Sequence, residues 1–189
     1  HTSVVKKSKM ILFSGVMYNH RGIDVLLNAA PTVIKKIPEV KFVLLGDGPE
    51  LDNLKKIAEN LKIEKNIEFK GWIKRDEVMN YLADASIAIG PLRSTTVTKN
   101  ALPIKVLEYM ASSLPILSQK NTLANDVLVD DENGYSVTDP EDLATKIVHI
   151  LENNEKRIKM GTKSYEMSLK FDWENVAKKI LTEYDDVKF

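Results

Sequence analysis

The sequence of 189 residues contains no cysteine, which excludes disulfides, thiolate catalysis and cysteine-based zinc sites and fits a reducing compartment. It also lacks an apolar run long enough to span a membrane, which takes about 18 residues or more. Lysine plus arginine equals aspartate plus glutamate at 27 each, so there is no basic excess of the kind that nucleic-acid binding requires. The first residues, HTSVVKKSK, have neither an initiator methionine nor the apolar core of a signal peptide. We therefore expect residues 1–8 to be a disordered or cloning-derived leader of a domain taken from a longer protein.

Hydrophobic residues make up 43% of the chain and form short strand-like runs that alternate with helical stripes. The predicted strands are Lys9–Ser14, Val40–Leu45, Ile67–Phe69, Ser86–Ile89, Pro115–Ser118 and Gly134–Val137. The predicted helices between them include Asp76–Leu82 and Pro103–Ser112, and the region after Val137 is helical up to a final stripe that begins at Trp173. Because these strands are almost continuously apolar, we predict an α/β fold: a Rossmann-like, doubly wound parallel sheet of about six strands, with helices on both faces and further C-terminal helices.

The stretch from Ser86 to Leu117 carries the strongest chemical signal. A buried strand breaks at Gly90-Pro91 into a polar loop, which enters a helix at Pro103. A helix start at the carboxyl edge of a parallel sheet favours an anion, because its first backbone amides are unpaired and its dipole is positive there. A carboxylate one turn further in, at Glu108, can accept hydrogen bonds from a ribose diol. The segment therefore predicts a nucleotide-diphosphate site.

Three glycine-containing loops follow predicted strands, at Gly15–Gly22, Gly46–Pro49 and Gly90–Pro103. In a parallel sheet all three emerge at one edge, where glycine permits close backbone approach. The second loop does not complete the dinucleotide fingerprint G-x-G-x-x-G, since Leu51 stands where the last glycine is needed. A nicotinamide-dependent dehydrogenase is therefore excluded.

The motifs FSG…RGIDVLLNAA, FVLLGDGPE, IEFKGWI, ASIAIGP, PIKVLEYMASSLPIL, NGYSV and FDWENVAKKIL occur in this order. From about Met10 to Tyr184 the chain resembles the C-terminal, donor-binding half of the retaining GT-B glycosyltransferases of group 1, also called family 4. The resemblance implies that residues 1–189 are a single nucleotide-sugar-binding domain and that the N-terminal acceptor domain is missing. It also implies that the final helix, residues 173–189, contacts that missing domain or, when exposed, promotes self-association.

The family pattern assigns roles to residues of this chain. Glu108 matches the second acidic residue of a Glu-x7-Glu pattern and would bind the ribose hydroxyls, and Arg21 matches a basic residue that neutralises the diphosphate. Backbone amides near Ile104 and Lys105 would cap the distal phosphate, and the segment around Trp72 and Ile73 would lie against the base. The implied catalytic set is Arg21, Asn100 and Lys105, and the implied nucleotide-binding set is Gly15, Gly46, Gly48, Trp72, Ile73, Ile104 and Glu108.

Three positions depart from the family pattern. Asn100 stands where the first acidic residue belongs, Val16 replaces a basic residue after the first-loop glycine, and Pro103 replaces a common glycine. One of two usual phosphate cations is thus missing unless Lys105 or Arg93 substitutes for it. These changes place donor identity and catalytic competence in question more than they affect the fold.

The resemblance implies transfer of a sugar, with retention, from a nucleotide-diphosphate donor such as a UDP- or GDP-sugar, with no cofactor and no metal. The acceptor would belong to polysaccharide or glycolipid assembly, which places the parent enzyme in the cytoplasm, with peripheral membrane association. The isolated domain is expected to bind donor without catalysing transfer. Two alternatives stay open: a non-catalytic nucleotide-binding or regulatory module of the same architecture, and a nucleotide-sugar epimerase, for which no carboxylate and histidine set can be assembled. Trp173 is interpreted as a packing anchor.

Overall fold

The computed structural model describes residues 8–100, 102–122 and 127–186. Within these residues six strands form one sheet in which each neighbouring pair runs parallel. The strands are β1 (Met10–Ser14), β2 (Lys41–Leu45), β3 (Ile67–Gly71), β4 (Ile87–Ile89), β5 (Ile116–Gln119) and β6 (Gly134–Val137). The predicted parallel α/β sheet is confirmed.

The strand order is β3-β2-β1-β4-β5-β6. Strands β2 and β3 are added on one side of β1 and strands β4 to β6 on the other, so the strand order reverses between β1 and β4. β1 pairs with β2 over its whole length, from Met10 opposite Lys41 to Ser14 opposite Leu45. On its other side β1 pairs with β4 through Ile11 and Leu12. In open α/β sheets ligands bind beyond the carboxyl ends of strands at such a reversal. The loops after β1 and β4 therefore occupy the position that this topology provides for a ligand.

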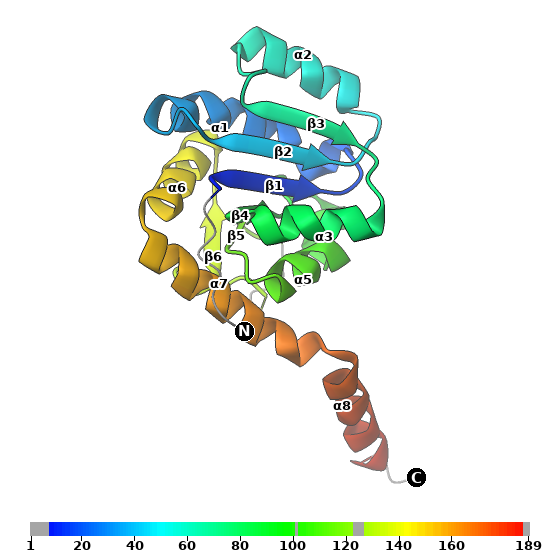
Figure 1. Cartoon of the computed structure of the whole chain (residues 1–189). Helices are drawn as coiled ribbons and strands as arrows, with labels where there is room; N and C mark the ends of the chain where they lie inside the picture. Colours follow the sequence, from blue (N-terminus) through cyan, green and yellow to red (C-terminus); the bar gives the residue numbers. More distant parts are fainter. Residues whose placement is uncertain (1–7, 101, 123–126, 187–189) are drawn as a thin grey trace.

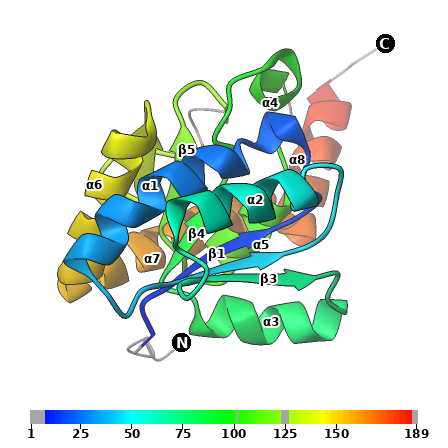
Figure 2. The same cartoon turned by 90° about the horizontal axis from the view of Figure 1, so that it is seen from above.

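Helices cover both faces of the sheet (Figures 1 and 2). One face packs against α1 (Ile23–Lys36), α2 (Leu51–Leu61) and α6 (Pro140–Glu152). The opposite face packs against α3 (Arg75–Asp84) and α5 (Ile104–Ala111). α7 (Asn154–Ser168) contacts both α5 and α6 and so joins the two layers at one side of the sheet.

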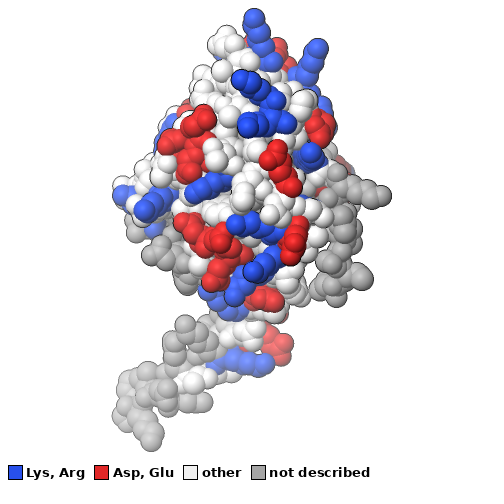
Figure 3. Space-filling model, turned by 90° about the vertical axis from the view of Figure 1, so that its left-hand side faces the viewer, with Lys and Arg blue, Asp and Glu red and all other residues white. Residues whose placement is uncertain are grey.

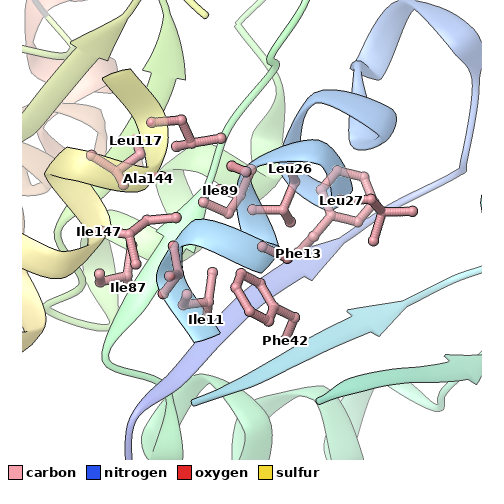
Figure 4. Packing of buried hydrophobic residues seen from close by; sticks show 14 of the residues in the cluster. Ile11, Phe13, Leu26, Leu27, Phe42, Ile87, Ile89, Leu117, Ala144 and Ile147 are labelled. Carbon is pink, nitrogen blue, oxygen red and sulfur yellow. The ribbon is translucent and has the colours of Figure 1, made fainter. Parts of the chain in front are cut away.

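The larger core lies between β1, β4 and the helices α1 and α6. Figure 4 shows Phe13 and Ile11 of β1 facing Leu26 and Leu27 of α1, with Ile147 of α6 beside them. All five side chains are buried. Successive strand residues point to opposite faces, so Leu12, between Ile11 and Phe13, belongs to the second core, against α3 and α5. Because apolar side chains leave both faces of such a strand, the sheet needs a layer of helices on each face.

The last helix, α8 (Trp173–Asp186), leaves the body of the domain (Figure 1). Its contacts are mainly with the adjoining turn η2 (Leu169–Phe171). Trp173 is 85% exposed, and Ile180 and Leu181 are also exposed. Among the described residues Trp173 is therefore not a packing anchor, because the helix that carries it contacts mainly the adjoining turn η2.

Charged side chains of both signs are interspersed on the described part of the face shown in Figure 3. Such a mixed surface is typical of solvated helices and does not form the basic stripe of a nucleic-acid-binding protein.

Several element boundaries differ from the predicted ones. β3 continues to Gly71, and the predicted helix Asp76–Leu82 extends to Arg75–Asp84. The polar loop between β4 and α5 contains a short helix, α4 (Thr96–Asn100), that carries no apolar periodicity to predict it. Of the expected leader at residues 1–8, residues 1–7 lie outside the described residues, whereas the Ser8 carbonyl accepts a hydrogen bond from Ser86 Oγ.

Candidate functional site

The first and second loops are locked together by glycine. Gly46 has a φ of 125°, and a Cβ atom built there would lie 2.0 Å from the Gly15 carbonyl oxygen. A Cβ at Gly48 would lie 2.7 Å from the Met17 amide nitrogen. The Met17 N–H donates to the Asp47 carbonyl at 2.9 Å, so the backbones of the two loops pair directly. Gly15, Gly46 and Gly48 thus allow the two loops to pack against each other; their predicted contact with a nucleotide stays a prediction.

The first and third loops are also in direct contact. The Leu92 N–H donates to the Arg21 carbonyl at 2.8 Å, and Gly22, with φ of 70°, lies against the backbone of Leu92 and Arg93. The Arg93 guanidinium donates to the carbonyl and side-chain oxygens of Asn19 and pairs with Asp24 Oδ2 at 2.6 Å. The predicted convergence of the three loops at one edge of the sheet is confirmed. Arg93, however, already binds acceptors of its own, so it does not stand free as a replacement phosphate cation.

Arg21 ends a single 3-10 turn, η1 (Asn19–Arg21), and is half-buried. Gly22 closes this turn in the left-handed conformation and serves as the N-cap of α1. Next to it, the His20 ring stacks on Tyr18 with ring centroids 5.3 Å apart. Burial and the neighbouring Arg21 charge lower the pKa of His20, so this histidine is neutral at pH 7. The first loop thus places the Arg21 guanidinium next to a neutral imidazole.

Helix α5 presents its first turn at the same edge. Pro103 is the N-cap and supplies no side-chain hydrogen bond to the first amides of the helix. Ile104 is 74% exposed, and Lys105 Nζ pairs with Glu108 Oε2 at 2.9 Å. An uncapped helix start beside a cation is electrostatically suited to an anion.

Lys105 and Glu108 lie at the mouth of a cavity of about 260 Å³ between α3 and α5. Its lining residues are Arg75, Val78, Met79 and Leu82 of α3 and Lys105, Glu108, Ala111 and Ser112 of α5. Trp72, in the segment that leads from β3 to α3, is 77% exposed, whereas Ile73 packs partly against the second core. Arg21 is not among the described residues that line this cavity. The structure therefore places Glu108 and Lys105 together, with Arg21 on the neighbouring loop.

Tyr109 connects α5 to the end of β1 and was missed by the sequence analysis. Its buried hydroxyl accepts a hydrogen bond from the Ser14 N–H at 2.8 Å and donates to the Ser14 carbonyl at 3.1 Å. Burial raises the pKa of this hydroxyl, the Ser14 hydrogen bond lowers it, and the charges of Glu108 and Arg21 act in opposite directions. Tyr109 thus fixes α5, the helix that carries Glu108, to the end of β1. The only sequence signal for Tyr109 is its position next to Glu108 on the apolar face of the helix.

Asn100 is the last residue of α4, and its side chain lies outside the described residues. Its predicted catalytic role stays a prediction. In the part of the chain that the structure describes, no group of three or more histidine, aspartate or glutamate side chains is arranged to hold a metal ion. Over the same residues, no helix combines the length and hydrophobicity that crossing a bilayer requires.

Comparison with known families agrees with this geometry. The profile of the family described as glycosyl transferases group 1 matches residues 2–167. The chain belongs to this family. This group 1 glycosyltransferase chain is 31% identical over 181 residues to an alpha-monoglucosyldiacylglycerol synthase of Streptococcus pneumoniae. The aligned region is 94% of this chain and 38% of that protein. It is 28% identical over 167 residues to the sulfoquinovosyl transferase SQD2 of Arabidopsis thaliana, and the aligned region is 86% of this chain and 31% of that protein. The chain thus spans about a third of the length of these two relatives.

Solved structures share the fold of this group 1 chain. HepE of Anabaena, crystallised in complex with UDP, superposes with a TM-score of 0.82 at 18% identity, over 97% of this chain and 50% of that one. The C-terminal domain of a group 1 glycosyl transferase, LpcC of Francisella tularensis, superposes with a TM-score of 0.72 at 24% identity, over 84% of this chain and 82% of that one. The GT-B architecture implied by the sequence motifs is confirmed.

Proposed function

We propose that this chain is the nucleotide-sugar-binding half of a retaining glycosyltransferase. The observation that carries the proposal is the direct contact between the first loop, which holds Arg21, and the third loop, which leads into α5: the Leu92 N–H donates to the Arg21 carbonyl at 2.8 Å. The start of α5 is uncapped, and its first turns carry the Lys105–Glu108 pair. A nucleoside diphosphate needs an acceptor for its ribose hydroxyls and cations or amides for its phosphates. This edge supplies both.

Each predicted residue has a chemical task in this proposal. The Glu108 carboxylate accepts hydrogen bonds from the ribose diol, and such charge-assisted bonds contribute about 1.5–3 kcal/mol each. Arg21 holds the diphosphate with its planar guanidinium, and the first amides of α5 and Lys105 bind the distal phosphate. Lys105 pairs with Glu108. Donor binding redistributes this ion pair, because Lys105 turns to the phosphate and Glu108 to the ribose.

Sugar transfer adds negative charge to the leaving diphosphate. Groups that are already aimed at that charge lower the barrier, because they need no reorganisation when the bond breaks. Arg21, Lys105 and the α5 dipole fill this role in the proposal, and Asn100 stands at the sugar end as a neutral hydrogen-bonding group. The base lies against Trp72 and Ile73. The donor is a UDP- or GDP-sugar, and the reaction needs no cofactor.

The acceptor site belongs to a second domain. The chain spans only part of its relatives, and GT-B enzymes perform transfer between two domains. One of the relatives is a diacylglycerol-modifying synthase, which supports a glycolipid or polysaccharide acceptor and a parent enzyme at the cytoplasmic membrane surface. In this proposal the isolated chain binds donor nucleotide but does not transfer sugar, so turnover by the 189 residues alone would contradict it.

Titration of the chain with UDP, GDP and ADP, followed by thermal unfolding, tests the proposal. Ligand at about 100 times its dissociation constant adds about 2.7 kcal/mol to the free energy of unfolding. We expect one of the three nucleotides to raise the melting temperature, Glu108→Ala to abolish the rise, and Glu59→Ala, at an exposed glutamate on α2, to preserve it. If none of the nucleotides stabilises the wild-type chain, the proposal is wrong.

A non-catalytic nucleotide-binding module is the second candidate. The neutral Asn100 and Val16, at positions where relatives carry charge, favour it. Both candidates predict nucleotide binding, so the discriminating measurement is sugar transfer by the two-domain parent protein. Activity that is lost in Arg21→Ala supports the transferase, and nucleotide binding without any transfer supports the module.

A further inference from the structure

We propose that Arg93 is a positioning residue: its guanidinium clamps the first loop so that Arg21 is held in place for the diphosphate. This inference rests on the proposed function, because Arg21 is assigned to the diphosphate there. It assigns to Arg93 a different role from that of a replacement phosphate cation, which the sequence left open.

The clamp joins the third loop to the η1 turn and the first turn of α1, which are 74 and 69 residues away in sequence. Arg93 Nη1 donates to the Asn19 carbonyl at 2.9 Å and to Asn19 Oδ1 at 2.7 Å. Arg93 Nη2 donates to Asp24 Oδ2 at 2.6 Å, in the first turn of α1. One planar group thus grips the beginning of the η1 turn and the helix that follows it. Arginine suits this task because its donors are fixed in a rigid fork.

In the sequence, Arg21 lies between Asn19 and Asp24, the two residues that Arg93 binds. Asn19 begins the turn that Arg21 ends, and Asp24 is three residues after Arg21. The Arg21 carbonyl accepts the Leu92 N–H at 2.8 Å, from the residue just before Arg93. Gly22 rests against the same backbone, where a Cβ would lie 2.7 Å from the Leu92 carbonyl carbon. The third loop therefore holds the Arg21 backbone directly and the residues on both sides of it through Arg93.

The clamp has a consequence for binding. A cation that is already ordered loses less conformational entropy when it meets a phosphate than one on a mobile loop. Removal of the clamp should weaken the binding of the diphosphate and leave the binding of the base and ribose unchanged.

Calorimetric titration with UDP and with uridine separates these two effects. We expect Arg93→Ala and Asp24→Asn each to weaken UDP binding by about threefold to tenfold while uridine binding stays unchanged. Lys36→Ala, at an exposed cation near the end of α1, is the matched control and should bind both ligands as the wild type does. In an Arg21→Ala background, Arg93→Ala should cause no further loss, because it acts through Arg21. Equal losses for UDP and uridine, or an additive loss in the double variant, would overturn the proposal.

Hydrogen exchange without ligand tests the clamp itself. The N–H groups of Arg21 and Gly22 bond within the turn, to the Tyr18 and Asn19 carbonyls. Their exchange should accelerate in Arg93→Ala and Asp24→Asn, while the amides of α2 stay protected; unchanged exchange in both variants refutes the clamp. If exchange accelerates but the wild-type chain binds none of UDP, GDP and ADP, the proposed function fails while the clamp stands. Asp24→Asn keeps the test valid if Arg93→Ala does not fold.

Discussion

Replacing Tyr109 by phenylalanine removes one oxygen atom from the point where α5 meets β1. The hydroxyl is buried and serves both backbone groups of Ser14, accepting from its N–H and donating to its carbonyl. Phenylalanine keeps the ring and its packing, so the change creates no cavity beyond the missing hydroxyl. The Ser14 N–H is then left buried without this acceptor.

The expected loss follows from that unpaired donor. A buried polar group that loses its partner costs about 1–3 kcal/mol of unfolding free energy. For a chain of this length each kcal/mol shifts the melting temperature by about 2–4 °C. Urea unfolding should therefore show a lower midpoint with an unchanged m-value, since the surface exposed on unfolding stays the same.

The exposed Tyr18 provides the control. Tyr18→Phe removes a hydroxyl at the surface and should change the unfolding free energy by less than about 0.5 kcal/mol. If Tyr109→Phe is equally mild, the connection between α5 and β1 does not depend on this hydroxyl, and the reasoning is refuted.

Three further predictions concern other parts of the chain. Gly46 and Gly71 both have positive φ, but of the two only Gly46 faces a backbone atom. Gly71→Ala should therefore cost about 1–2 kcal/mol of unfolding free energy for the backbone conformation alone, and Gly46→Ala should cost more. Equal losses in urea unfolding would contradict this. Folding lowers the pKa of His20 below its usual 6.5, so between these two pKa values the unfolded chain holds a proton that the folded chain does not. The free energy of unfolding should therefore decrease as the pH falls from about 6.5 to the lowered pKa of the folded chain. A His20→Gln variant should show a weaker decrease, and an identical pH profile would refute the assignment. The exposed apolar side chains of α8 should make the chain associate at high concentration, and light scattering should show the association reduced in Ile180→Glu; a strict monomer would count against it.

The sheet and the meeting of its strand-to-helix loops at one edge were predictable because they depend on patterns that repeat. Continuous apolar runs such as Met10–Ser14 predict buried parallel strands, and a parallel sheet brings its strand-to-helix loops to one edge. Glu108 was proposed as a ribose-binding residue because a helix start and a carboxylate one turn later form a recognisable spacing, and that role stays a prediction. These features depend only on residues that are close in sequence.

The contacts that the sequence did not predict join residues far apart in the chain. Tyr109 and Ser14 are 95 residues apart, and Arg93 and Asn19 are 74 residues apart. A tyrosine on an apolar helix face has the same local pattern whether its hydroxyl is bonded or not, so periodicity cannot reveal the partner. Trp173 was misassigned for a related reason, because an amphipathic stripe indicates a helix but does not show which surface covers it.

The interlocked glycine loops have a consequence for the rate of nucleotide binding under the proposed function. Since Gly46 and Gly48 lie directly on the backbone of Gly15 and Met17, the first two loops have no room to shift independently. In the proposed function, a nucleotide that binds at this edge therefore meets a preformed surface and does not have to wait for a rare open state. Stopped-flow traces should therefore be single exponentials whose rate rises linearly with nucleotide concentration and does not reach a plateau.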